Sequence, residues 1–262
     1  MPEKNRYEAL ISKVFHNHFK KGISQFEFER DELQPVAKKL GIALPDNLGD
    51  VMYSFRYRRP LPADVTKTAG KGREWIIEPA GRSRYRFKLT KLGRIVPRSD
   101  LLAVKIPDAT PEIIAANAKT DEQALLARVR YNRLIDIFLG ITTYSLQNHM
   151  RTTVSGMGQI EIDEIYVGVN RNGQQFVIPV QAKGGTDQLA AIQTLQDIAC
   201  CAEKFANLTC RPISAQFAAD ETIALFELAK DDDVIKVVEE KHYKLVPADS
   251  IQASDLKQYA KH

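Results

Sequence analysis

Three polar side chains on two predicted strands are the residues of this sequence best suited to chemistry. Asp163 lies on the first strand, and Gln181 and Lys183 lie two residues apart on the second. Because side chains alternate between the faces of a strand, Gln181 and Lys183 share one face, and a hairpin can bring Asp163 to them. Carboxylate and amide oxygens suit a hard cation such as Mg²⁺, and a lysine ammonium supplies a positioned charge. The three residues therefore predict metal-assisted chemistry in which negative charge develops.

The strands themselves follow from alternation and turn chemistry. Residues 158–169 alternate in strand fashion, residues 170–173 read Asn-Arg-Asn-Gly, and residues 175–183 form the second run. The Asn-Gly pair is favoured in hairpin turns. An acid and a lysine across a hairpin can also be a plain ion pair. A functional site is favoured because Gln181 and Lys183 interrupt an apolar strand, where burying polar groups is costly.

This arrangement resembles the PD-(D/E)xK nucleases, in the variant where Gln replaces the middle acid. The motif here is Asp163, seventeen intervening residues, then Gln181-Ala182-Lys183. The resemblance covers about residues 120–217. The sequence departs from the family pattern at Ile162, where the family name has Pro, and at Gln181, which lacks the charge of an acid. Metal affinity would therefore depend more on the other acids.

The resemblance implies Mg²⁺-dependent hydrolysis of phosphodiester bonds. Asp163, the Gln181 side chain and the Ala182 carbonyl would be metal ligands, with Glu161 as a further one because it shares the face of Asp163. Lys183 would orient or activate the attacking water and neutralise charge that develops on the phosphorane. Its loss should abolish cleavage more than DNA binding. Glu164 competes with Glu161 for the ligand role, but it lies on the other face.

Glu122 is the remaining catalytic candidate. A helix is predicted to open near residues 120–122, and Glu122 lies one turn before Leu125 and Leu126 on the buried stripe. In related nucleases an upstream helical Glu faces the metal site, so the resemblance implies that Glu122 supports the metal site or binds a second metal ion there. The alternative is a first-turn glutamate that only complements the helix dipole.

Charge divides the chain into two predicted domains. Residues 1–98 hold 21 Lys/Arg against 11 Asp/Glu, whereas residues 99–262 hold 16 against 22. A basic half suits a polyanion and an acidic half suits metal binding, although a solvated surface can also segregate its charges. Prolines near residues 97 and 107–111 mark the boundary.

The first domain is predicted to contain three helices and a hairpin. Helices are expected over residues 4–20, over 28–40 with Gly41 as the stop, and from 45 to about 58, followed by a hairpin over residues 75–89 with one basic face. This order resembles a winged-helix DNA-binding domain. A winged helix can also mediate protein contacts, and arginines on a strand can simply face water.

DNA-contact candidates follow from that resemblance and from the helix of the second half. The candidates are Arg56, Arg58 and Arg59 at the end of the third helix, Arg82, Arg84 and Arg86 on the hairpin, and Arg130, Asn132 and Arg133 on the later helix.

The fold class predicted for the second domain is α/β (α+β), with a restriction-endonuclease-like mixed sheet flanked by helices. A helix is expected over residues 187–205, with Gln188, Gln193 and Gln196 on its wet side, and further strands near residues 208–217, 222–228 and 234–238. The three cysteines are too few and too badly spaced for a disulfide framework or zinc site, so we expect reduced thiols.

These observations predict a cytoplasmic type II restriction endonuclease that cleaves double-stranded DNA with Mg²⁺. No apolar run reaches the roughly 20 residues of a membrane span, and the first residues lack a signal-peptide pattern. Cutting both strands favours a homodimer, although monomers are also consistent with the motif, and a cognate DNA methyltransferase is the expected genetic partner. The alternatives are a winged-helix transcription regulator with a non-catalytic second half and a repair or junction-resolving nuclease.

Overall fold

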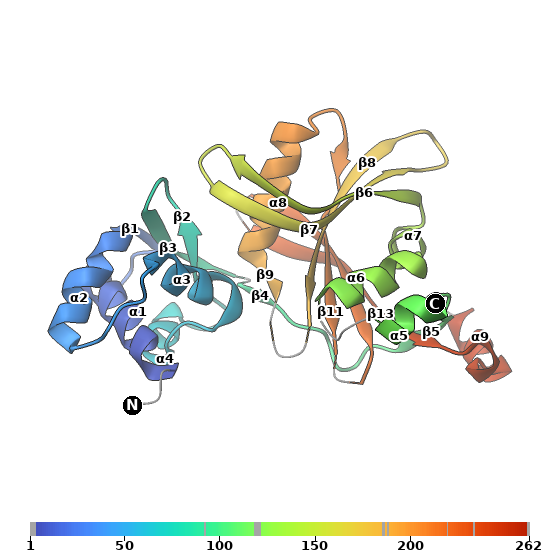
Figure 1. The fold of residues 1–262 in the computed structure, drawn as a ribbon, viewed down its shortest axis with the longest axis horizontal. Helices are drawn as coiled ribbons and strands as arrows, with labels where there is room; N and C mark the ends of the chain where they lie inside the picture. Colours follow the sequence, from blue (N-terminus) through green and yellow to red (C-terminus); the bar gives the residue numbers. More distant parts are fainter. Residues whose placement is uncertain are drawn as a thin grey trace. The chain divides into compact units, whose positions relative to one another are not determined.

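The computed structural model describes residues 4–260 apart from 92, 118–121, 185, 186, 188, 219 and 233, and it describes the backbone but not the side chains of residues 4–6 and 58. The chain divides into two compact units (Figure 1). The first unit contains residues 4–95, Thr152–Ile160 and Ala190–Gln196. The second contains Val96–Arg151, Glu161–Leu189 and residues 197–260.

The first unit packs helices on an antiparallel sheet of order β1-β3-β2 (Figure 1). Its helices are α1 (Lys4–His18), α2 (Leu33–Leu40), α3 (Leu48–Tyr53) and α4 (Ala63–Thr66), with short helical turns at Arg30–Glu32, Ser54–Arg58 and Lys67–Ala69. Its strands are β1 (Gln25–Glu29), β2 (Glu74–Pro79), β3 (Arg84–Thr90) and β4 (Arg94–Ile95). The predicted hairpin is confirmed, but Phe28 and Glu29, which were expected to begin a helix, lie in β1.

The core of this unit forms around Phe15. The apolar period of α1 buries Leu10, Ile11, Val14 and Phe15 completely. The Phe15 ring lies 5.0 Å from the ring of Phe87 on β3, measured between centroids, and 5.2 Å from that of Trp75 on β2. Aromatic pairs at this spacing stabilise beyond their buried area, so one side chain joins the helix to both strands of the hairpin.

Replacing Phe15 with Ala is expected to lower the free energy of unfolding by about 3–5 kcal/mol, because it removes a fully buried ring and leaves a cavity. Leu40→Ala is the control, since Leu40 is exposed and should cost less than about 1 kcal/mol. Urea unfolding followed by circular dichroism measures both. Equal losses in the two variants would contradict this account of the core.

The second unit is built on a mixed sheet of order β5-β13-β12-β11-β8-β7-β6. Pairing is parallel for β13 with β5 and for β11 with β8, and antiparallel for β7 with β8, β11 with β12 and β12 with β13. The strands that lie wholly or partly in this unit are β5 (Ala103–Pro107), β6 (Thr142–Val154), β7 (Gly158–Val169), β8 (Gln175–Lys183), β9 (Leu189–Ala190), β10 (Thr209–Cys210), β11 (Ile213–Phe217), β12 (Ile223–Asp231) and β13 (Val234–Val246). The helices that lie wholly or partly in it are α5 (Glu112–Asn117), α6 (Glu122–Tyr131), α7 (Leu134–Leu139), α8 (Ala191–Lys204) and α9 (Ala253–Tyr259), with a short turn at Ala248–Ser250.

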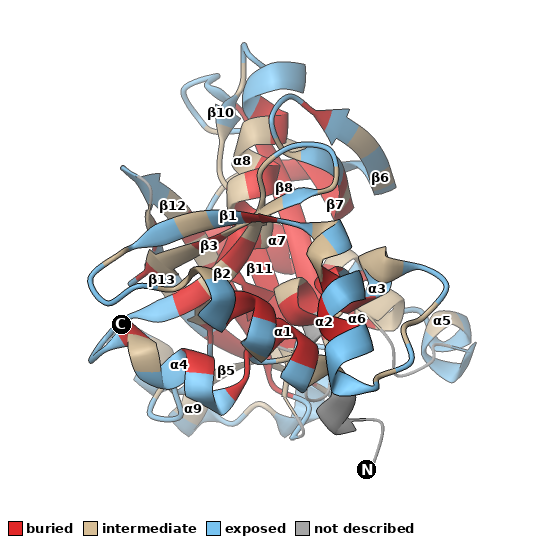
Figure 2. Ribbon diagram, turned by 90° about the vertical axis from the view of Figure 1, so that its left-hand side faces the viewer, coloured by how far each residue is buried: buried red, intermediate tan, exposed pale blue. Residues whose placement is uncertain are grey.

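Helices cover both faces of this sheet around β8, which is buried along almost its whole length (Figure 2). The face that carries Ile178, Val180 and Ala182 packs with α6 and α7 in one apolar core. The other face carries Gln181, which bonds to α8. The coarse prediction of a mixed sheet flanked by helices is therefore confirmed, and all three cysteines are free thiols, two of them buried.

Several predicted elements differ from the structure in their bounds. The helix expected from residue 120 onward begins, within the described residues, at Glu122 and is interrupted at Arg133, whose φ of 50° is left-handed. Residues 120 and 121 lie outside the described residues. The later helix begins at Ala191, not at 187, and Gln196, expected on its wet side, is buried. None of the described helices combines the length and apolar character needed to cross a membrane.

Candidate functional site

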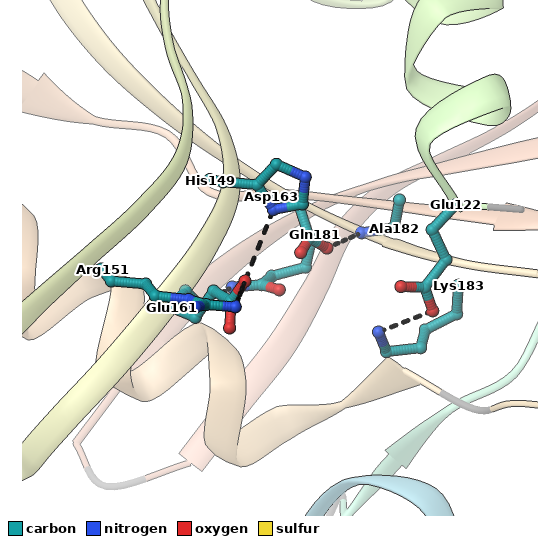
Figure 3. A network of polar contacts seen from close by, with 8 residues as sticks. All are labelled: Glu122, His149, Arg151, Glu161, Asp163, Gln181, Ala182 and Lys183. Carbon is teal, nitrogen blue, oxygen red and sulfur yellow. Dashed lines mark hydrogen bonds and ion pairs between the residues drawn. The ribbon is translucent and has the colours of Figure 1, made fainter.

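Side chains, and not backbone pairs, connect β7 to β8 where the two strands carry the predicted motif (Figure 3). The backbone register runs from Val169↔Gln175 to Glu164↔Val180. One residue further, Asp163 Oδ2 accepts a 2.8 Å hydrogen bond from the Ala182 N–H. In a second contact the side chain comes from β8 and the backbone group from β7, because Gln181 Nε2 donates to the Glu161 carbonyl at 3.0 Å. The carboxylate and the amide are therefore held side by side at the end of the ladder.

The backbone of Ala182 takes part in the same arrangement. The N–H and C=O of one strand residue point to the same edge of the strand. Because the Ala182 N–H is directed at Asp163, its carbonyl is directed to the β7 edge as well. The Ala182 methyl group lies in the apolar core on the α6 face. The alternation predicted from the sequence thus places the Ala182 side chain away from the polar group and its backbone toward it.

Lys183 and Glu122 form an ion pair at the end of β8. Lys183 Nζ lies 2.9 Å from Glu122 Oε1, and the side chain of Lys183 is only 11 % exposed (Figure 3). Lys183 is the last residue of β8 and Glu122 is the first of α6, so the pair joins a strand end to a helix start. The structure therefore brings Glu122 to the motif, which a glutamate serving only the helix dipole would not require.

The electrostatics of Asp163 are those of a desolvated acid among other acids. Burial raises the pKa of the Asp163 carboxyl above its ordinary value. The Ala182 N–H and the Lys183 ammonium lower it, while the charges of Glu122 and Glu161 raise it further. The group therefore carries a net desolvation cost that a bound cation would relieve.

Asp197 of α8 belongs to this cluster and was not predicted from the sequence. Its carboxyl is almost fully buried, and Asp197 Oδ1 accepts from Gln181 Nε2 at 2.9 Å. Burial raises the pKa of Asp197 well above its ordinary value, and the charge of Asp163 adds to the rise. The polar residues Gln193 and Thr194 lie one turn before Asp197 on the same side of the helix, so the sequence did not mark Asp197 out as a buried acid.

Glu161 reaches a different set of partners from those predicted. Its carboxylate lies 3.4 Å from His149 Nδ1 and 3.3 Å from an Arg151 guanidinium nitrogen, both on β6 (Figure 3). His149 has a left-handed φ of 49°, an uncommon conformation for a residue with a side chain. Glu161 therefore lies near Asp163 but directs its carboxylate to His149 and Arg151 on the neighbouring strand.

The donor chemistry of the cluster fits a hard cation. Among the described residues, no three His, Cys, Asp or Glu side chains gather as a ready metal cage. The oxygens at hand are instead one carboxylate, one side-chain amide and one backbone carbonyl, from Asp163, Gln181 and Ala182. Mg²⁺ usually binds through few protein oxygens and keeps several waters, so this set suits it better than it suits zinc.

Arg130 has a structural partner. Its Nε donates to Glu164 Oε1 at 2.7 Å, and Ser145 donates to the same oxygen at 2.6 Å. The Glu164 side chain is 0 % exposed and that of Arg130 is 33 % exposed. Glu164 thus lies on the α6 face, away from Asp163 as alternation predicted, and it occupies the guanidinium that was expected to contact DNA.

We expect Arg130→Met to lower the free energy of unfolding by about 3 kcal/mol, because a buried carboxylate loses its counter-ion. Arg133→Met is a matched control, since Arg133 is also paired with an acid, Asp136, but is 60 % exposed. Its loss should cost less than about 1 kcal/mol. Thermal and urea unfolding of the two variants test this, and a small effect at Arg130 would mean that the pair is not needed for the fold.

Asn132 is also engaged inside the protein. It is buried, its oxygen accepts from the Ala109 N–H at 2.7 Å, and its nitrogen donates to the Thr110 hydroxyl at 2.9 Å. This geometry holds the loop before α5 and does not support the predicted DNA contact.

The arginines of the β2–β3 hairpin differ in how much of their charge is compensated. Arg86 bonds to Glu27 at 2.6 Å and to Glu78 at 3.0 Å, on the strands to either side of it. Arg84 is more exposed and lies 3.9 Å from Glu27. Arg82 is exposed in the turn. The face is therefore mixed in charge along β3, whereas the prediction was a basic face.

Of the DNA contacts predicted near residues 56–59, after α3, Arg56 and Arg59 are only partly exposed. The Arg56 guanidinium lies 4.6 Å from the ring centre of Tyr57 and donates to its hydroxyl at 2.5 Å. Arg59 is half-buried, and its carbonyl accepts from Arg94 at 2.8 Å. The side chain of Arg58 lies outside the described residues.

Comparison of the chain with protein-family models, with curated proteins and with solved structures finds no match.

Proposed function

We propose that this protein is a Mg²⁺-dependent endonuclease of the restriction type that hydrolyses phosphodiester bonds in double-stranded DNA. The observation that carries the proposal is the convergence of Asp163, Gln181 and Lys183 beyond the last backbone pair of β7 and β8. Polar side chains on the face of a buried strand are costly, so their presence calls for a function. The three types match a phosphoryl-transfer site, which needs oxygen ligands for a cation and a fixed positive charge.

The order of elements around the site adds support. From α6 to β11 the chain runs helices α6 and α7, the neighbouring strands β6, β7 and β8, the short strand β9, helix α8, the short strand β10, and then β11 parallel to β8. This order fits the strand and helix pattern on which the resemblance to the PD-(D/E)xK nucleases depends. The acid lies on the middle strand of the three and the Gln-Ala-Lys segment on the third.

Asp163, Gln181 and the Ala182 carbonyl would hold the cation. When bound, Mg²⁺ supplies a Lewis acid for a phosphoryl oxygen and lowers the pKa of a coordinated water. Asp163 is already fixed by the Ala182 N–H, so little ordering of that side chain would accompany binding. Glu161 would join the site only after releasing His149 and Arg151.

Lys183 would place its ammonium beside the scissile phosphate, with Glu122 as the acceptor that orients it. The 2.9 Å ion pair fixes the Lys183 side chain at one end of the site. A positioned ammonium stabilises negative charge as it develops, and such a group contributes mainly in the transition state.

Removal of the motif side chains should therefore abolish cleavage. Asp163→Asn and Lys183→Ala should each lower the rate of DNA cleavage in Mg²⁺ by about 10²–10³-fold or more. Lys183→Ala should leave DNA affinity within about threefold, because its charge acts mainly in the transition state. EDTA should abolish cleavage by the unchanged protein. The measurement is gel analysis of unmethylated phage DNA, with anisotropy for binding.

Asp249→Asn and Lys241→Ala are the controls for that experiment, since both residues are exposed in the second unit. Discrete fragments support restriction, whereas a smear supports a repair or junction-resolving nuclease. An unchanged protein that binds DNA but leaves it uncut with every divalent cation would overturn the nuclease proposal in favour of a regulator.

The first unit would bind the DNA in the manner of a winged helix. Helices followed by the β2–β3 hairpin, with β1 as its third partner, support this assignment. Arg82 and Arg84 are the hairpin arginines with the most exposed charge, so they are the favoured phosphate contacts. A homodimer would place one catalytic site on each strand of the DNA. A DNA methyltransferase of the same specificity would protect the host DNA.

The contribution of the hairpin to DNA binding can be measured from the salt dependence of the affinity. Arg82→Ala should weaken DNA binding and lower the slope of log K against log salt by about 1, as loss of one phosphate contact does. Arg86→Ala is the matched comparison, and its slope should change less because Glu27 and Glu78 already compensate the charge. Anisotropy titrations in EDTA provide both values. A larger slope change for Arg86 than for Arg82 would contradict this assignment.

A further inference from the structure

A pocket of about 140 Å³ lies within the first unit, along β2 and the start of β4. Its apolar lining includes Phe55, Leu61, Ile76 and Ile192. A protein cavity of about 150 Å³ is enough to bind one benzene molecule. The pocket therefore matches the size of a single six-membered ring.

Charged side chains line the same pocket, and cations outnumber acids among those that the structure describes. They are Arg56, Arg73, Arg94 and Glu74. Burial lowers the pKa of the Arg94 guanidinium and raises the pKa of the Glu74 carboxyl, although each charge partly offsets the shift of the other. Charges that are poorly solvated and incompletely balanced favour a ligand that complements them.

Arg56 has a donor that its protein neighbours do not use. Its Nη2 donates to the Tyr57 hydroxyl at 2.5 Å, which fixes the guanidinium over the Tyr57 ring. Its Nε is buried and finds no acceptor among the described residues. Because a buried N–H without an acceptor is costly, an acceptor on a molecule in the pocket would stabilise this arrangement.

Glu74 determines what else such a molecule must carry. A β-carbon at Gly93 would lie 2.6 Å from Glu74 Oε2, so the glycine makes room for this carboxylate at the start of β4. An ionised carboxylate only accepts hydrogen bonds, whereas a guanidinium only donates them. A ring that satisfies both must therefore present a donor to Glu74 and acceptors to the arginines.

We propose that this pocket binds a cytosine nucleotide, with the amino group of the ring at Glu74 and the ring carbonyl and phosphate at the arginines. Cytosine is a single ring whose exocyclic amino group is a recognised partner of Asp and Glu. A phosphate suits the excess of guanidinium charge. Two sources offer this chemistry, a free nucleotide and a cytosine turned out of a DNA duplex. The site goes beyond the proposed nuclease, because it uses none of the motif residues.

The test compares dCMP with dUMP, which differ in one exocyclic group, amino in dCMP and carbonyl in dUMP. Isothermal titration calorimetry of the full-length protein in EDTA should show that dCMP binds about 10-fold or more tightly than dUMP, because the uracil oxygen would face a carboxylate. Glu74→Gln should remove this preference, since an amide both donates and accepts. Arg56→Gln should weaken both nucleotides alike.

Glu78→Gln is the matched control, because Glu78 lies on the same strand but outside the pocket lining and bonds to Arg86. This variant should keep the preference for dCMP. Absence of saturable dCMP binding, equal affinity for the two nucleotides, or an equal loss of preference in both glutamate variants overturns the proposal. If Glu74→Gln does not fold, Arg73→Gln replaces it, since Arg73 is exposed. Unchanged dCMP affinity in Arg73→Gln then overturns the proposal.

A second titration separates the two sources of the ring. Duplexes that carry cytosine or uracil opposite an abasic site are titrated in EDTA. A preference for the cytosine duplex that Glu74→Gln removes supports a base from DNA, whereas a preference seen only with dCMP supports a free nucleotide. The outcome is independent of the nuclease proposal. A protein that prefers dCMP but cleaves no DNA with any divalent cation keeps the pocket and overturns only the nuclease.

Discussion

The hydrogen bond from the Ala182 N–H to the Asp163 carboxylate is the contact on which the arrangement of the site depends. It comes one residue after the last backbone pair of β7 and β8, so a side chain completes what the ladder leaves open. A buried N–H without an acceptor would be costly, which fixes Asp163 in this position. Beyond the same point, the Gln181 side chain donates to the Glu161 carbonyl of β7. A local end to backbone pairing thus creates room for two polar groups inside the sheet.

Acidic groups outnumber the ammonium of Lys183 around that contact. Asp163 and Asp197 are both buried, and burial raises the pKa of each, while Glu122 lies against Lys183. An excess of acids in a low-dielectric setting is unfavourable by itself and favourable toward a cation. The burial of these acids therefore carries an electrostatic cost in the free protein, which a nearby cation would reduce.

The sequence predicted which side chains share a face of one strand. It did not predict which residues from distant segments come into contact. Alternation alone placed Gln181 and Lys183 together and Glu164 on the opposite face. It could not give the position of Asp197, because the rotation of α8 over the sheet is a tertiary feature. It also missed β6, an edge strand whose mostly exposed side chains lack the apolar run that marks a buried strand. The partners of Glu161 on that strand were missed for the same reason.

Charged residues that look alike in the sequence have different roles because their neighbours differ. Arg130 neutralises a buried acid, Arg86 is shared between two glutamates, and Arg82 is exposed in a turn. The acids of the site also differ in their partners, since Asp163 accepts from the Ala182 N–H and Asp197 accepts from the Gln181 amide. Gln181 adds no charge to the cluster but brings a side chain with a donor end. That donor end needs an acceptor, and the acceptor supplied by α8, Asp197, is itself a buried acid, so the amide extends the polar group of the sheet to the helix that covers it.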